Sequence, residues 1–149
     1  MKIYLAADHA GFELKEKVKA FLVEQGYAVE DCGAHTLDAD DDYPDFIKVA
    51  VKKVARKPED RAILFGGSGQ GEAMVANRIK KVRAAVYYGA SQREVGDKIL
   101  ILSREHNDAN VLSIGARFVS EEAAKQAIVL WLKTPFSRKE RHARRIAKF

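Results

Sequence analysis

A glycine-rich segment near the middle of the chain carries the strongest chemical signal. Residues 62–77 read AILFGGSGQGEAMVAN, so an apolar run, Ala62–Phe65, precedes four glycines within six residues and then Glu72. Glycine permits positive φ angles and lets a ligand approach the main chain closely. Free N–H groups in such a turn and at the following helix start attract anions. The pattern predicts a buried strand, an anion-binding turn, and a helix over Ala73–Ile79, with Glu72 placed to take a proton from the ligand. The turn glycines are Gly66, Gly67, Gly69 and Gly71.

The loop departs from the common motifs that bind nucleotides or carry a nucleophile. No Lys-Ser/Thr pair follows the last glycine, as a Walker loop requires. A dinucleotide fingerprint would need a third glycine where Glu72 stands, and an acidic residue at the end of the next strand. Gln70 occupies the second glycine position of a nucleophile elbow around Ser68. The remaining interpretations are a small anionic ligand and a tight turn with no ligand.

Two further polar segments adjoin predicted strands. Asp8 and His9 follow the first strand, and ligands of parallel sheets collect outside the carboxyl ends of strands, so both residues should share a rim with the glycine loop. Arg104–Asn110 precedes the last strand and contains His106 and Asn107. Within one subunit His106 then lies at the opposite end of that strand, and it can meet the loop only through a bent helix or a second subunit. The simpler alternatives are helix capping by Asp8 and a polar turn before the last strand.

Positive charge is concentrated at the C-terminus. The net charge is +5, and segment 138–149, with six Lys/Arg and one Glu, accounts for all of it, which argues against general nucleic-acid coating. The spacing i, i+3, i+4, i+7 predicts one face of a helix over about 137–148 that either clamps a phosphate or is a solvated basic tail. That face consists of Arg138, Arg141, His142 and Arg145, and Arg117, just past the last strand, would join it.

Composition bounds the class of protein. A chain of 149 residues with 47% hydrophobic and 32% charged residues suits one globular domain over 1–149. No apolar stretch approaches the ~20 residues of a membrane span, and the N-terminal apolar run is too short for a signal peptide. The single cysteine, Cys32, excludes an intrachain disulfide and fits a reducing cytoplasm. The acidic loop Asp38–Asp42 lacks the ligand spacing of a calcium loop and is interpreted as solvated.

Apolar strands alternate with helix-period segments along the chain. This alternation predicts an α/β fold with a parallel sheet covered on both faces. The predicted strands are Ile3–Ala7, Tyr27–Asp31, Ala62–Phe65, Arg83–Tyr88 and Val111–Gly115. Besides the helix after the glycine loop, the predicted helices are Phe12–Gln25, Phe46–Ala55, Ser120–Thr134 and Arg138–Lys148.

Several short motifs, in their order along the chain, resemble the type B ribose-5-phosphate isomerases and the broader family that includes galactose-6-phosphate isomerase subunits. The motifs are AADHAGFELK at Ala6–Lys15, DCG at Asp31–Gly33, DYPDF at Asp42–Phe46, GGSGQGE with Ala76-Asn77, REHNDANVLSIGAR at Arg104–Arg117 and RHARR at Arg141–Arg145. The resemblance implies a Rossmann-like three-layer sandwich with five parallel strands. It also implies interconversion of ribose 5-phosphate and ribulose 5-phosphate through a cis-enediolate, in the pentose phosphate pathway, without metal or nucleotide cofactor. A six-carbon aldose 6-phosphate, such as allose or galactose 6-phosphate, stays open as the substrate.

The resemblance also implies a role for each candidate residue at a site shared by two subunits of a homodimer, or of a tetramer. Glu72 would move the proton between the first two carbons, and His106 would open the sugar ring with help from Asp8. Asn107 and the loop would hold the enediolate oxygens, and the arginines would bind the phosphate, with His9 nearby. The loop residues are Gly67, Ser68, Gly69, Gln70 and Gly71, and the arginines are Arg117, Arg141 and Arg145.

Two features depart from the family pattern. Many members carry a cysteine base where this chain has Gly66, whereas another branch uses a glutamate just after the loop, which Glu72 fits; Cys32 belongs to the DCG motif and is not the missing base. The segment Tyr88–Ser103 is also longer than the family pattern implies, by roughly two turns of ~3.6 residues. A nucleotide-binding module on the same sheet, and less so a nucleic-acid binder using the C-terminal helix, remain as rivals.

Overall fold

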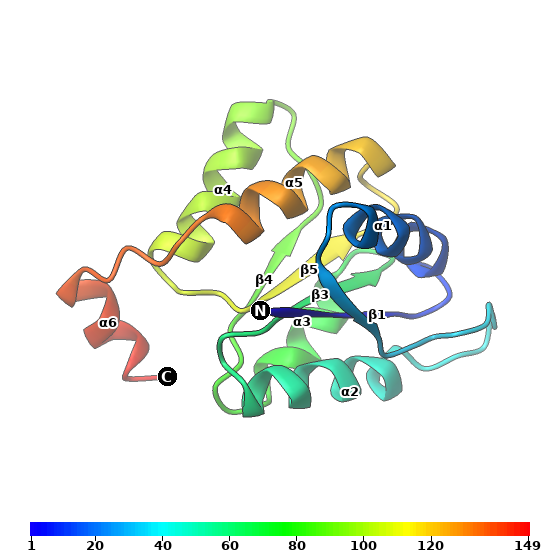
Figure 1. The fold of residues 1–149 in the computed structure, drawn as a ribbon, viewed down its shortest axis with the longest axis horizontal. Helices are drawn as coiled ribbons and strands as arrows, with labels where there is room; N and C mark the ends of the chain where they lie inside the picture. Colours follow the sequence, from blue (N-terminus) through cyan, green and yellow to red (C-terminus); the bar gives the residue numbers. More distant parts are fainter.

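The protein is built around one parallel five-stranded sheet. The computed structural model describes residues 1–149, and all neighbouring strands pair in parallel in the order β2-β1-β3-β5-β4 (Figure 1). The strands are β1 Lys2–Ala7, β2 Ala28–Asp31, β3 Arg61–Gly66, β4 Ala84–Tyr87 and β5 Val111–Gly115. The helices are α1 Phe12–Glu24, α2 Tyr43–Arg56, α3 Gln70–Asn77, α4 Arg93–Glu105, α5 Glu121–Lys133 and α6 Glu140–Ile146.

Helices cover both faces of the sheet, so the chain forms three layers. On one face α1, α4 and α5 pack against alternate strand residues such as Leu5, Ile63 and Leu112. On the other face α2 and α3 pack against the intervening residues, such as Ala6 and Leu64. Both faces are apolar because each is covered, which explains the nearly continuous apolar strands. The predicted α/β sandwich with five parallel strands is confirmed.

Element boundaries differ from the predictions at helix ends. Helix α2 begins at Tyr43 and not at Phe46, with Pro44 in its first turn, where the missing N–H leaves no helical bond unmade. Helix α3 begins at Gln70 and not at Ala73, because the glycine loop turns directly into it. No helix of the structure has the length and apolar character needed to cross a membrane.

The segment 88–103 contributes the crossover between β4 and β5. Two parallel strands need a connection of about a dozen or more residues, and α4 supplies it. Gly96 lies inside this helix because a Cβ there would come within 3.0 Å of the Tyr87 hydroxyl on β4. Glycine thus allows close packing of α4 on the edge strand.

The motif at the end of β2 is tied to α1 by a buried charge pair. The Lys15 side chain is fully buried, and its Nζ lies 2.8 Å from Asp31 Oδ1. Burial alone would raise the pKa of Asp31, but hydrogen bonds from Lys15, Lys19 and the Gly33 amide lower it to about 2. This pair fixes the chain where it leaves β2 toward the rim of the sheet.

Candidate active site

The strand order places a topological switch point at the carboxyl ends of β1 and β3. From β1 the chain moves to one side of the sheet with β2 and to the other side with β3. Ligands of open α/β sheets bind at such a switch point. Asp8 and His9 directly follow β1, and the glycine loop directly follows β3, so the structure brings these predicted residues to the same rim as expected.

The glycine loop is pinned to the end of β5. Gly69 has φ of +76°, which favours glycine, and its carbonyl oxygen accepts a 2.7 Å hydrogen bond from the buried Ser113 hydroxyl. The Ala116 and Arg117 amides donate to the carbonyl oxygens of Gly66 and Gly67, at 2.8 and 3.1 Å. These bonds fix the loop backbone before any ligand arrives.

Glu72 lies in the first turn of α3, and its carboxylate folds back against Gly66. The residue is only 4% exposed. A Cβ built on Gly66 would overlap the Glu72 carboxylate, so the acidic group fills the space in which a side chain at position 66 would stand. Burial raises the pKa of Glu72, its own backbone amide lowers it, and the negative charge of Asp8 raises it further.

Asp8 contributes both to the fold and to the site. One carboxylate oxygen, Oδ1, accepts a 3.1 Å hydrogen bond from the Gly11 amide in the turn that leads into α1. Helix capping by Asp8 was one alternative from the sequence, but the N-cap residue of α1 is Gly11 and no side chain caps this helix, so Asp8 holds the preceding turn instead. The second oxygen accepts no hydrogen bond within the chain, and the charge of this buried group reaches Glu72. Asp8 can therefore hold the turn with one oxygen and meet a ligand with the other.

Two residues of this rim were not predicted from the sequence. The side chain of Asp41 is 6% exposed, and its Oδ1 lies 2.7 Å from His9 Nδ1. Tyr43 closes over the loop, because a Cβ on Gly71 would lie 2.9 Å from its hydroxyl. The interpretation of Asp38–Asp42 as a solvated loop was therefore wrong for Asp41, since the loop folds back onto His9. The only indication in the sequence that Tyr43 lies near the glycine loop is its position in the DYPDF motif.

The carboxylates around His9 raise the question of a metal. Ligand atoms of Asp8, His9 and Asp41 all lie within 4.8 Å of one another. However, Asp41 Oδ1 already accepts hydrogen bonds from the His9 ring nitrogen and from the His9 amide, at 2.7 and 3.1 Å. Both lone pairs of that oxygen are thus used, and His9 and Asp41 form a hydrogen-bonded histidine–carboxylate pair.

A second cluster of predicted residues lies at the amino end of β5. The rings of His106 and His142 stack edge to face with centroids 4.1 Å apart, and Arg141 Nε donates to His142 Nε2 at 3.0 Å. Partial burial, His142 and Arg141 lower the pKa of His106. Asn107 and Arg145 are exposed nearby on the same side of the molecule, on the turn after α4 and on α6.

One predicted member of the basic helix face is misplaced. Arg138 has φ of +54° and precedes α6, which begins at Glu140, so it does not share a helical face with Arg141 and Arg145. His142 is buried against the end of α4, where its Nδ1 lies 3.2 Å from the Glu105 carbonyl oxygen. The helix therefore exposes Arg141, Arg144 and Arg145 to solvent and uses its histidine for docking.

Two arginines outside the predicted site residues, Arg83 and Arg104, hold the turn containing His106 and Asn107. Arg83 donates to the carbonyl oxygens of Asn107 and Asp108, at 2.9 and 2.7 Å. Arg104, which is buried, donates to Asp108 Oδ1 at 2.8 Å. The turn that carries the exposed Asn107 is thus rigidly supported from beneath.

The two clusters cannot meet within one chain. We term Asp8, His9, Gly66–Glu72 and Arg117 the loop half-site, and His106, Asn107, Arg141, His142 and Arg145 the histidine half-site. Strand β5 separates them and spans about 16 Å. In Figure 1, α6 projects beyond the amino end of the sheet, away from the rim that carries Asp8. This placement confirms the expectation that His106 lies at the far end of β5.

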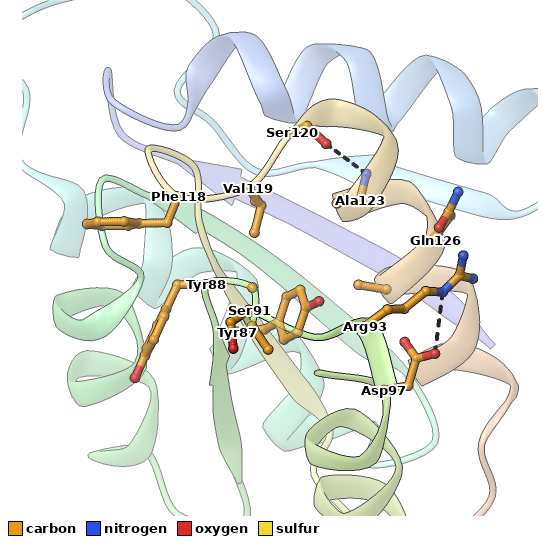
Figure 2. A pocket seen from close by; sticks show the side chains of 13 residues that line it. Tyr87, Tyr88, Ser91, Arg93, Asp97, Phe118, Val119, Ser120, Ala123 and Gln126 are labelled. Atoms are coloured by element: carbon orange, nitrogen blue, oxygen red, sulfur yellow. Dashed lines mark hydrogen bonds and ion pairs between the residues drawn. The ribbon is translucent and has the colours of Figure 1, made fainter. Parts of the chain in front are cut away.

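A separate cavity of about 560 Å³ adjoins the segment 88–103. Figure 2 shows Tyr87 and the ion pair of Arg93 and Asp97 on one side of it and the start of α5 on the other. No residue of either half-site lines this cavity. Its lining contains no cluster of acid–base groups comparable with Glu72 and Asp8.

Cys32 has the properties of a packing residue. It is buried among α2-side core residues. Burial raises the pKa of its thiol to about 11, so the reactive thiolate is scarce at neutral pH. The placement agrees with the expectation that Cys32 is not a catalytic base.

The fold and the loop half-site define an α/β protein in which a glycine loop suited to a small anion lies next to a buried carboxylate. The chain belongs to the ribose/galactose isomerase family, whose model matches residues 3–149. A ribose-5-phosphate isomerase B from Mycolicibacterium paratuberculosis is 39% identical over 146 residues, covering 98% of this chain and 87% of the relative.

Solved structures agree with this assignment. The ribose-5-phosphate isomerase B of Mycoplasma genitalium with bound ribulose-5-phosphate superposes with a TM-score of 0.90 at 36% identity, covering 99% of this chain and 92% of the other. The enzyme of Thermotoga maritima gives a TM-score of 0.87 at 38% identity, covering 99% and 95%. Both the fold and the family expected from the sequence motifs are thereby confirmed.

Proposed function

We propose that this protein interconverts ribose 5-phosphate and ribulose 5-phosphate through a cis-enediolate. The observation that carries the proposal is the Glu72 carboxylate, which fills the side-chain space of Gly66 beside a pre-ordered glycine loop. Relatives named ribose-5-phosphate isomerase B support the substrate, as does the similar structure with bound ribulose-5-phosphate.

The base in this mechanism is Glu72. It removes the proton from C2 of the open-chain aldose and returns it to C1, and the same group serves the reverse reaction. A raised pKa suits this task because the group must be a competent base and, after proton uptake, a competent acid. Its position against Gly66 explains how a glutamate replaces a cysteine at that site: both side chains reach the same space.

The loop stabilises the intermediate. Backbone N–H groups of Gly67–Gly71 at the start of α3 face the developing charge on the enediolate oxygens, where oriented donors are most effective. Asp8 assists on the same rim, and His9 and Arg117 lie beside it. The loop needs no rearrangement, since Ser113 and the end of β5 already hold it.

The active site is completed by a second copy of the chain. The histidine half-site lies on the far side of β5 and exposes Asn107, Arg141 and Arg145. In a homodimer of two-fold symmetry each of these groups reaches the partner's loop half-site. There His106 opens the sugar ring, Asn107 binds the enediolate, and the arginines bind the phosphate. A tetramer of such dimers retains the same sites.

The proposed compartment and pathway follow from the cysteine content and from the reaction. A single isomerase domain of 149 residues with one free, buried cysteine suits a reducing cytoplasm, and the reaction belongs to the pentose phosphate pathway. The partner of the site is a small sugar phosphate, with neither nucleic acid nor membrane required.

A coupled assay with five- and six-carbon aldose phosphates tests this function. We expect turnover of ribose 5-phosphate to exceed that of allose or galactose 6-phosphate. A preference for a six-carbon substrate would reassign the substrate within the same chemistry. No turnover of any of these sugars, together with tight binding of NAD or ATP, would replace the isomerase by the nucleotide-binding alternative.

A further inference from the structure

The loop between β2 and α2 delivers one carboxylate to His9. Both hydrogen bonds of the Asp41 side chain go to this residue: Oδ1 accepts from the His9 amide at 3.1 Å and lies 2.7 Å from His9 Nδ1. The side chain of Asp41 is 6% exposed, whereas that of His9 is 34% exposed. The pair is therefore shielded on the carboxylate side and open to solvent on the imidazole side.

Asp41 gains little for its own loop from this arrangement. Its second oxygen, Oδ2, is buried and has no hydrogen-bond partner. A buried acceptor without a partner costs free energy, and the only side-chain hydrogen bonds of Asp41 that can offset this cost are the two to His9. The neighbouring Asp40, by contrast, is exposed and its side chain accepts no hydrogen bond. Of these two adjacent aspartates, only Asp41 turns inward and contacts His9.

The contact defines which ring nitrogen of His9 is available. Because Nδ1 is committed to Asp41, Nε2 is the ring atom left for a ligand. The charged groups that face His9 are Asp8 after β1, Asp41 in the β2–α2 loop, and Arg117 after β5. The hydrogen bond to Asp41 raises the pKa of His9, partial burial opposes that shift, the charge of Asp8 supports it, and Arg117 opposes it.

We propose that Asp41 is a positioning residue that holds His9 with Nε2–H as a donor to the anionic group of the substrate. This inference rests on the proposed function, because it assigns the phosphate of the sugar as the group that His9 meets. His9 and Arg117 then bind the phosphate from the loop half-site, and Arg141 and Arg145 of a second copy of the chain bind it from the histidine half-site.

A pH dependence of substrate affinity follows from this role. Affinity is highest where His9 is protonated and falls as the pH rises through its pKa. Asp41 moves that fall to higher pH, so its carboxylate matters most near and above neutrality. At acid pH His9 is protonated with or without Asp41, and the charge of residue 41 matters little there.

Asp41→Asn keeps the acceptor oxygen and removes the charge, and Asp40→Asn is the matched control one residue away. The ratio of KM in Asp41→Asn to KM in the parent is measured from about pH 5 to about pH 8, the range in which histidine titrates. The ratio cancels the titration of the substrate phosphate. We expect it to be near one at acid pH and to rise toward tenfold for each unit by which the His9 pKa falls, with kcat within about twofold.

The titration of His9 is followed directly by NMR, with His9→Gln to assign its signal. The pKa of His9 should fall in Asp41→Asn and stay unchanged in Asp40→Asn. In the His9→Gln background, Asp41→Asn should add no further change in KM. Asp41→Ser is the second variant, and it should reproduce the pH-dependent loss if removal of the carboxylate is the cause.

A KM ratio that is constant across pH, or an unchanged His9 pKa in Asp41→Asn, would overturn the proposal and leave Asp41 a structural residue. Inorganic phosphate separates this result from failure of the proposed function. Even in a chain that isomerises none of the sugars, phosphate should shift the His9 signal, and near pH 7.5 it should bind Asp41→Asn more weakly than the parent. Equal phosphate binding by both proteins contradicts the inference whatever the enzyme assay shows.

Discussion

In the loop half-site the acid–base groups are shielded from water, whereas the histidine half-site is largely open to it. Glu72 and Asp8 are 4% and 7% exposed, and three carbonyl oxygens of the loop accept hydrogen bonds from β5 or from the two residues that follow it. Asn107, Arg141 and Arg145 are exposed. Burial raises the pKa of Glu72, whereas burial and neighbouring cations lower the pKa of His106.

In the proposed homodimer, this difference divides the work of one site between two chains. The group that removes a carbon-bound proton needs a dry, fixed environment, which a single chain builds by itself. Groups that bind a phosphate or open a sugar ring must extend to the substrate, and a helix that projects from the sheet can carry them there. In the proposed homodimer, the loop half-site of the second chain would cover these groups and remove them from water.

The largest expected effect is the loss of the buried base. Glu72→Gln should lower turnover of ribose 5-phosphate by roughly 10²–10⁴-fold, the usual contribution of general base catalysis. KM should change little, because the amide keeps the shape that fits Gly66. Steady-state kinetics measure both constants. Near-normal turnover would place the base elsewhere and remove the main contrast between the two half-sites.

Mixing two inactive variants tests whether the half-sites come from different chains. Glu72→Gln and His106→Asn are co-expressed; in a heterodimer one site carries both changes and the other carries neither. Random pairing gives half heterodimers, so about a quarter of the parental activity should return. Glu72→Gln mixed with the double variant is the control and should recover nothing. Absence of recovery in the first mixture, with heterodimers present by mass spectrometry, would mean that each site lies within one chain.

Removal of a phosphate-binding arginine should affect affinity and not turnover. Charge-assisted hydrogen bonds contribute ~1.5–3 kcal/mol each. With a factor of ten per ~1.4 kcal/mol, Arg145→Ala should raise KM by roughly 10–150-fold. Arg145→Lys should also raise KM, because lysine keeps the charge but not the planar fork.

The exposed Arg144 on the same helix provides the control, and Arg144→Ala should leave KM unchanged. The difference between Arg145→Ala and the parent should vanish with unphosphorylated ribose. If Arg145→Ala binds the sugar phosphate as well as the parent does, α6 is only a basic surface and the histidine half-site contains no phosphate clamp.

The predictability of the molecule from its sequence also differs between the regions. The parallel sheet of apolar strands follows from periodicity, and the rim position of Asp8 and the glycine loop follows from the rule that ligands collect at the carboxyl ends of strands. The position of Glu72 at the loop was predictable, but its fold back onto Gly66 was not, because it depends on a contact between side chain and backbone in three dimensions.

Long-range folding of loops explains the failures. Asp41 lies 32 residues from His9, and nothing in the run DADDD distinguishes the one aspartate that turns inward. Arg138 fits the helical spacing of the basic face, but the chain takes a positive φ there before α6 begins. The buried role of His142 likewise depends on the docking of α6 against the end of α4.

The smallest expected effect is on stability, and it again separates the half-sites. The pKa of Glu72 is raised in the folded chain, so folding favours its protonated form. The resulting stability is fully present below the unfolded pKa, near 4.5, and is lost as the pH rises through the higher folded value. At neutral pH the parent therefore holds a buried charge that Glu72→Gln lacks.

We expect this variant to melt at a higher temperature than the parent near neutrality and at a similar temperature near pH 4.5, where both carry a neutral group. A gain of about 2–4 °C would correspond to ~1 kcal/mol for a chain of this size. His106→Asn is the comparison from the other half-site, and as a partly exposed substitution it should change the free energy of unfolding by no more than ~0.5 kcal/mol. Melting curves of the three proteins at both pH values decide the point. A neutral-pH gain for His106→Asn with none for Glu72→Gln would reverse the contrast, since the energetic cost of the site would then lie at its open end and not around the buried base.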